Sequence, residues 1–61
     1  MFFKKFILEN NIGKNVAFKT DYYKGNGIIA ILGDGNPGIT TDSSIFEMDD
    51  IRKLRVLKWI Q

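Results

Sequence analysis

The residue types that usually perform catalysis are scarce in this chain of 61 residues. It contains no histidine and no cysteine, which removes the common general base near neutral pH, the thiol nucleophile and most zinc ligand sets. Asp49 and Asp50 are adjacent, so on a strand their carboxylates would point to opposite faces, and we expect turn or capping roles for both. The sequence therefore predicts a protein that is not an enzyme and that uses no cofactor and no metal.

One glycine-rich segment, Gly33-Asp34-Gly35-Asn36-Pro37-Gly38, has the G-x-G-x-x-G spacing of dinucleotide-binding loops. Those loops need a helix that begins at the loop and directs its N–H groups at a pyrophosphate. Here Ile39-Thr40-Thr41 follows and has the composition of a strand, and the chain has no room for a second βαβ unit. We therefore interpret the segment as a loop between strands.

Cations and aromatic rings remain as groups that could bind a ligand. Six cations near the two ends give +6, whereas residues 6–50 hold three lysines and seven acids and give −4. If the two ends are neighbours in the fold, these cations form one patch, and aromatic rings beside it can stack on unpaired bases. This alternative function, binding of RNA or single-stranded DNA, would use Lys4, Lys5, Tyr22, Tyr23, Lys24, Arg52, Lys53, Arg55 and Lys58.

Apolar residues at the two ends predict a protein interface. A last strand that directs Leu54 and Val56 inward directs Leu57 and Trp59 outward, where they need a cover from the N-terminal aromatics or from a second copy in a homodimer. Our leading expectation is therefore a non-catalytic module that acts through protein–protein contacts, as an adaptor or a small inhibitor of a larger protein. The expected interface residues are Phe2, Phe3, Phe6, Leu57 and Trp59. A third hypothesis, a nucleotide-like ligand held between subunits, has no residue signature.

The segment 44–60 fits two short strands around an acidic turn. At about 100° per residue its apolar side chains scatter around the whole helical circumference, whereas with period two Phe46 and Met48 share one face, as do Leu54 and Val56. The alternative is α+β, β-hairpins with a C-terminal helix from about Ser44, supported by a capping-box spacing to Glu47. Burial of the apolar side chains contributes more free energy than a helix cap does, so we predict strands.

The remaining segments predict further strands and one helix. Residues 2–10 read as a short amphipathic helix, with a strand as the alternative, and in either form we expect the aromatics to be buried. Residues 14–20 alternate as a half-buried strand. The segment 25–27 predicts a bulge or tight turn, and 28–32, apolar on both faces, a strand at the centre of the fold. Residues 39–41 and 45–48 are expected to pair.

The order of these segments resembles small β-barrels of the SH3-like and Sm-like class. The opening, Ile12 to Lys19 followed by Gly27-Ile28-Ile29, and the close, Phe46 to Leu54, carry the resemblance. It implies an all-β fold, a barrel of about five short strands with a short N-terminal helix. Sm-like proteins assemble into rings and bind RNA, but Arg52-Lys53-Leu54-Arg55 stands where their Ile-Arg-Gly is expected. Their RNA role therefore does not carry over.

Length and hydropathy place further bounds on the chain. We expect one small domain over 1–61, with residues 1–12 as an amphipathic N-terminal segment and 13–61 as the barrel. The absence of cysteine suits a reducing compartment, so we expect a cytoplasmic protein. The apolar run at residues 6–8 is too short for a signal peptide or a membrane span, and no membrane association is expected.

Overall fold

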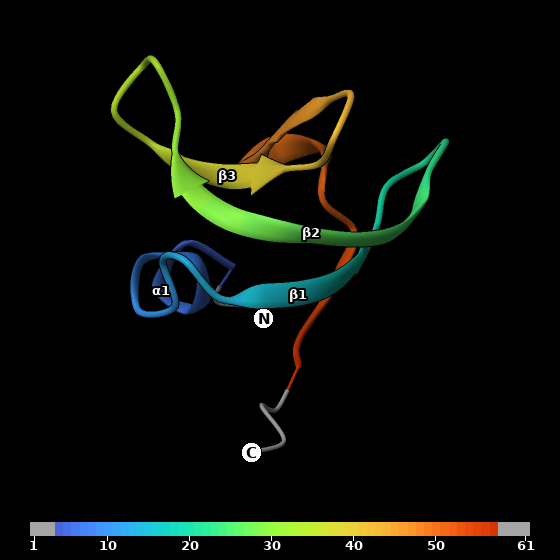
Figure 1. The fold of residues 1–61 in the computed structure, drawn as a ribbon, viewed down its shortest axis with the longest axis horizontal. Helices are drawn as coiled ribbons and strands as arrows, with labels where there is room; N and C mark the ends of the chain where they lie inside the picture. Colours follow the sequence, from blue (N-terminus) through green and yellow to red (C-terminus); the bar gives the residue numbers. More distant parts are fainter. Residues whose placement is uncertain (1–3, 58–61) are drawn as a thin grey trace.

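Residues 4–57 are described by a computed structural model, in which a short helix precedes five strands (Figure 1). The elements are α1 (Lys4–Glu9), β1 (Asn15–Lys19), β2 (Lys24–Ile31), β3 (Pro37–Thr40), β4 (Ile45–Glu47), a 3₁₀ turn η1 (Met48–Asp50) and β5 (Lys53–Val56). The prediction of a mainly β protein with five strands and a short N-terminal helix is confirmed at this level.

All five strands belong to one antiparallel sheet in the order β4-β3-β2-β1-β5. Figure 1 shows β2 as a long curved strand between β1 and β3, with α1 at the end of the sheet where β1 begins. Within residues 4–57 no hydrogen-bonded ladder joins β4 to β5. The sheet is therefore not closed into the expected barrel, and β4 and β5 are its two edges.

Alternation along β1 divides the sheet into an inner and an outer face. Val16 and Phe18 are buried, whereas Lys19 is exposed, as the period-two pattern predicts. The buried core consists of one residue from α1, five from the strands and turns, and three partly buried neighbours. These are Leu8, Val16, Phe18, Ile29, Ile39 and Ile51, with Phe46, Met48 and Leu54 packed against them.

The end of α1 is fixed by two asparagines. The side-chain amides of Asn10 and Asn11 donate to the carbonyl groups of Phe6 and Ile7 in the last turn of the helix, and the Phe6 carbonyl also accepts from the Asn10 backbone amide. Gly13 then takes a left-handed backbone with φ of 87°, and the chain enters β1. The predicted helix is confirmed over residues 4–9, and the strand alternative for this part of the chain is wrong.

The alternative of a helix from Ser44 is also wrong. The Ser44 amide donates to Thr41 Oγ1 and the Thr41 amide donates to the Ser44 carbonyl oxygen, so Ser44 closes the turn between β3 and β4 and caps no helix. The acidic residues Asp49 and Asp50 lie in η1, where the chain bends toward β5. The predicted pair of strands around an acidic turn is therefore confirmed, and the bend buries Ile51.

The prediction of a bulge or tight turn at residues 25–27 is wrong, because these residues pair regularly with β1 inside β2. Glycine serves a close approach there and not a turn. A Cβ added at Gly27 would lie 2.5 Å from Ile39 Cγ2 and 2.7 Å from the Thr40 carbonyl oxygen. The close approach of strand β3 therefore leaves no room for a side chain at position 27.

Burial on both faces of residues 28–32 is not found. β2 does occupy the centre of the strand order, as predicted, and Ile29 is fully buried. However, Ile28 is 45% exposed and Ile31 is 55% exposed. Ile28 projects from the face opposite to that of Ile29, which is the exposure expected when only one face of an antiparallel sheet is covered. Ile31 is on the same face as Ile29 and is exposed at the last residue of β2.

Candidate functional site

A row of three lysines crosses the outer face of the sheet. In the strand register, Lys19 of β1 lies directly opposite Lys24 of β2 on one side and Lys53 of β5 on the other. All three residues are exposed. Like charges placed directly opposite each other on adjacent strands repel, so this row costs stability unless counterions or a ligand neutralise it.

The next row along the same face is smaller and holds a fourth cation. Ala17 lies between Asn26 of β2 and Arg55 of β5. Together the two rows form a shallow hollow of about 660 Å³, lined by Ala17, Phe18, Lys19, Lys24, Gly25, Asn26, Lys53, Leu54 and Arg55. Among these described lining residues four are cations and none is an acid. We call this surface the cationic hollow; its four cations suit an anionic ligand.

A second hollow, about 490 Å³, adjoins the cationic hollow at Asn26, which lines both. Its lining consists of amides, hydroxyls, one acid, a glycine, an aromatic ring and an isoleucine, and the described residues include no lysine or arginine. They are Asn15, Tyr23, Asn26, Gly27, Ile28, Thr40, Thr41, Asp42 and Ser43. We call this surface the amide hollow.

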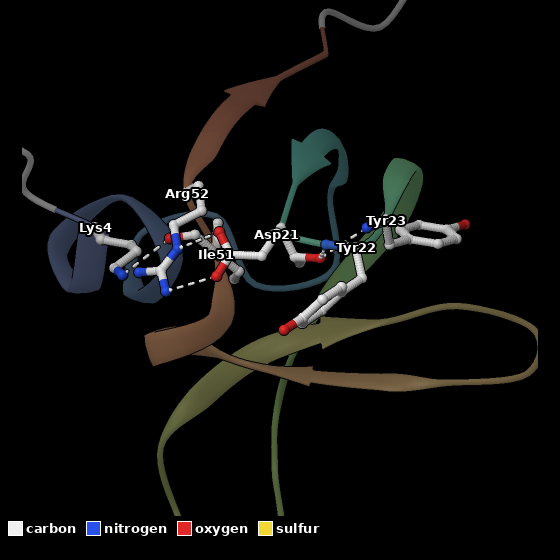
Figure 2. A network of polar contacts seen from close by, with 7 residues as sticks. Lys4, Asp21, Tyr22, Tyr23, Ile51 and Arg52 are labelled. Carbon is white, nitrogen blue, oxygen red and sulfur yellow. Dashed lines mark hydrogen bonds and ion pairs between the residues drawn. The ribbon is translucent and has the colours of Figure 1, made fainter.

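The patch predicted from the two ends of the chain is divided by the fold. Lys24, Lys53 and Arg55 line the cationic hollow, but Lys4 and Arg52 make other contacts. Figure 2 shows both beside Ile51, whose carbonyl oxygen accepts a hydrogen bond of 3.0 Å from Lys4 Nζ.

The other members of the predicted patch do not line the cationic hollow. Lys5 is an exposed residue of α1 and is not among the lining residues. Lys58 lies outside the described residues. The α1 members of the predicted patch therefore do not line the cationic hollow; Lys4 instead contacts Ile51, the residue before Arg52.

Arg52 is paired with an acid from the turn between β1 and β2. Its guanidinium donates from Nε and Nη2 to the two carboxylate oxygens of Asp21, at 3.0 and 3.1 Å (Figure 2). The hydrogen bond and the charge of Arg52 lower the pKa of the Asp21 carboxyl, and Asp21 in turn raises the pKa of Arg52. The charge of Arg52 is thus compensated within the chain.

The two tyrosines of that turn do not line the cationic hollow, although the sequence interleaves them with cations. The backbone amides of Tyr22 and Tyr23 both donate to Thr20 Oγ1, which fixes the turn. The Tyr23 ring stacks on Phe46 with a centroid distance of 5.0 Å. Tyr22 is 98% exposed, and it lines a separate groove whose rim carries Asp21 and Asp50. Acids beside the rings disfavour a phosphate backbone there.

Of the expected protein-interface residues, the structure describes Phe6 and Leu57. Phe6 is 66% exposed, so residues 4–57 do not cover it, and the residue of α1 that enters the core is Leu8. Leu57 is half-buried, and its amide donates to the Asn15 carbonyl oxygen at 3.1 Å. Phe2, Phe3 and Trp59 lie outside the described residues.

Lys19, the central residue of the lysine row, is absent from the predicted patch. Its position depends on the register of two ladders, one of which joins segments more than 30 residues apart in the chain. One signal in the sequence predicts that Lys19 and Lys24 are neighbours. A turn at residues 20–23 places residues 19 and 24 opposite each other in a hairpin.

Residues 4–57 contain neither a metal-binding cluster of carboxylates nor a membrane-spanning helix. Among residues 4–57, no three or more Asp or Glu side chains gather closely enough to hold a metal ion. No helix in that part of the chain is long and apolar enough to cross a membrane. Comparison of the chain with family models, curated proteins and solved structures gives no significant match.

Proposed function

We propose that this chain is a non-catalytic binding module whose cationic hollow binds the phosphate backbone of a nucleic acid strand. The observation that carries the proposal is the row Lys24, Lys19 and Lys53, three cations directly opposed across three strands with no acid among the described lining residues. A phosphate chain placed over this row would replace repulsion between lysines with attraction and would release its own condensed counterions.

The scaffold also favours binding of a charged chain. Each lysine of the row belongs to a different strand, and hydrogen-bonded ladders fix the spacing of the strands. The cations are therefore held near one another before any ligand arrives, which lowers the ordering cost of binding. Arg55 in the neighbouring row adds a planar donor suited to a phosphate oxygen.

The test is binding of a labelled single-stranded 12-nucleotide DNA or RNA, measured by fluorescence anisotropy at two salt concentrations. Four phosphate contacts predict a log–log salt slope of roughly −3 on a single strand. Lys19→Glu should weaken binding by about tenfold or more, because it removes one contact and places a carboxylate in the hollow.

The matched control is Lys5→Glu, which makes the same change in charge on α1 and should leave the affinity within about twofold. Equal losses for the two variants would contradict a site in the cationic hollow and would favour the patch at the chain ends. Absence of binding by the wild type at low salt would reject the function itself.

A second candidate is the protein–protein module expected from the sequence, and the exposure of Phe6 favours it. An aromatic ring left in solvent on a short helix suits burial against another chain, including a second copy. Light scattering at tens of micromolar tests the homodimer: a dimer that Phe6→Ser converts to a monomer supports it, and a monomeric wild type contradicts it.

At a finer level of fold, we propose that the sheet belongs to the SH3-like small-barrel class. Support comes from the strand order β4-β3-β2-β1-β5 and from the single 3₁₀ turn η1 between β4 and β5. An experimental structure in which β4 and β5 approach and complete a barrel would agree, and one with the two edges splayed apart would contradict the assignment.

A further inference from the structure

The outer face of the sheet changes in character from one row to the next. The first row consists of lysines, and the second places Ala17 between Asn26 and Arg55. In the third row Ile28 is opposite Asn15 on one side and Thr40 on the other. The face thus passes, within three rows, from cations to amides around an exposed isoleucine.

The amide hollow contains groups suited to a ligand that is polar but not anionic. Its described lining residues include the Asp42 carboxylate and no cation, so a phosphate is unfavourable there. Among residues 4–57, the side-chain amides of Asn15 and Asn26 make no hydrogen bond within the chain. Each therefore presents two donors and an acceptor, the pattern that pairs with the edge of a nucleic acid base.

The two hollows are close enough to hold two parts of one nucleotide chain, since Asn26 lines both. Ala17, at the centre of the second row, adds only a methyl group between them, so nothing bulky separates a ligand over the lysines from one over Ile28. Ile28 is 45% exposed and offers an apolar surface for the flat side of a base.

We infer that the amide hollow receives an unpaired base while the cationic hollow holds the adjoining phosphates. Asn26 and Asn15 hydrogen-bond the edge of that base, and Ile28 contacts its face. The ligand is therefore a single strand, because in a duplex the base is paired and stacked and cannot enter. This inference rests on the proposed function and names its substrate class.

The test compares two single strands of equal length and charge, a 12-nucleotide oligodeoxyadenylate and a 12-nucleotide strand of abasic sites. The wild type should bind the abasic strand about tenfold more weakly. Asn15→Ala should weaken oligodeoxyadenylate binding to near the abasic level and leave binding of the abasic strand unchanged, because Asn15 lines the amide hollow and not the cationic hollow; the unchanged binding also shows that the variant is folded. Asn26→Ala should weaken oligodeoxyadenylate binding as well.

The matched control is Asn36→Ala, the same substitution in the exposed loop at residues 33–36, which should change neither affinity. Equal binding of the two strands by the wild type, or equal competition by a duplex, would overturn the inference and leave the proposed function standing. Failure of both strands to bind would overturn the two together.

Discussion

The hairpin formed by β1 and β2 has one face that is buried in the core and one that is exposed and positively charged. On the inner face, Phe18 is buried and its ring lies 5.5 Å from that of Tyr23 and 5.0 Å from that of Phe46. On the outer face, the next residue, Lys19, is exposed and faces two other lysines. Adjacent residues thus belong to a region that stabilises the fold and to one that costs stability, which is the expected mark of a binding surface.

The same contrast holds for charges. At the end of the hairpin, Asp21 and Arg52 satisfy each other through two hydrogen bonds. Around the lysine row, the described lining residues of the cationic hollow include no acid that could pair with a lysine. The fold alone accounts for the compensated pair, whereas we propose that a bound anionic ligand compensates the row of lysines.

The largest effect is expected for the inner face. Phe18→Ala removes the ring that connects Tyr23 and Phe46 to the core, and should lower the free energy of unfolding by about 3 to 5 kcal/mol. Urea denaturation followed by circular dichroism measures it. Tyr22→Ala, the control in the neighbouring turn, should leave the midpoint unchanged because that ring is 98% exposed. A loss of similar size for both variants would contradict the division of the hairpin into two faces.

A smaller effect of opposite sign is expected for the outer face. Lys19→Gln removes the central charge of the row, and should raise the free energy of unfolding by roughly 0.2 to 1 kcal/mol at low salt while it weakens nucleic acid binding. The gain should shrink in high salt, because counterions screen the repulsion that the substitution removes. Lys5→Gln serves as the control. A destabilised Lys19→Gln protein would show that the row is not repulsive.

The smallest effect is expected for the ion pair. The folded-state pKa of Asp21 lies below the ordinary carboxyl value of 3.8, so its contribution to stability is present above that value and is lost as the pH falls through the folded pKa. Asp21→Asn should therefore be slightly less stable than the wild type at pH 6, and the difference should narrow as the pH is lowered below 3.8. The lowered pKa of Asp34, caused by hydrogen bonds from Asn36, is common to both proteins and cancels. A difference that does not change with pH would contradict this account.

Local patterns in the sequence predict the strands well, because period-two alternation depends only on which face of a strand is covered. Val16, Phe18 and Leu54 follow this alternation. The acidic residues Asp49 and Asp50 form the turn expected between the last two strands. The glycine-rich segment 25–27 is wrongly predicted to be a turn or bulge, because glycine is common in turns. The structure shows that a side chain at Gly27 would collide with β3.

The candidate site was only half predictable. Lys53 and Arg55 belong to the patch expected from the sequence, but Arg52 is paired with Asp21 and Lys4 with the Ile51 carbonyl group. Which cations become neighbours is set by the pairing of β1 with β5, and no local pattern contains that register. Lys19 enters the site only through it.

The most direct test of the central claim is a map of amide chemical shifts in isotopically labelled protein during titration with a 12-nucleotide single strand. The cationic hollow predicts the largest changes at the amides of residues 17–19, 24–26 and 53–55, with small changes in α1 and at Tyr22. Changes concentrated at Lys4 and Lys5, or the absence of any change at low salt, would contradict the claim that this face of the sheet binds nucleic acid.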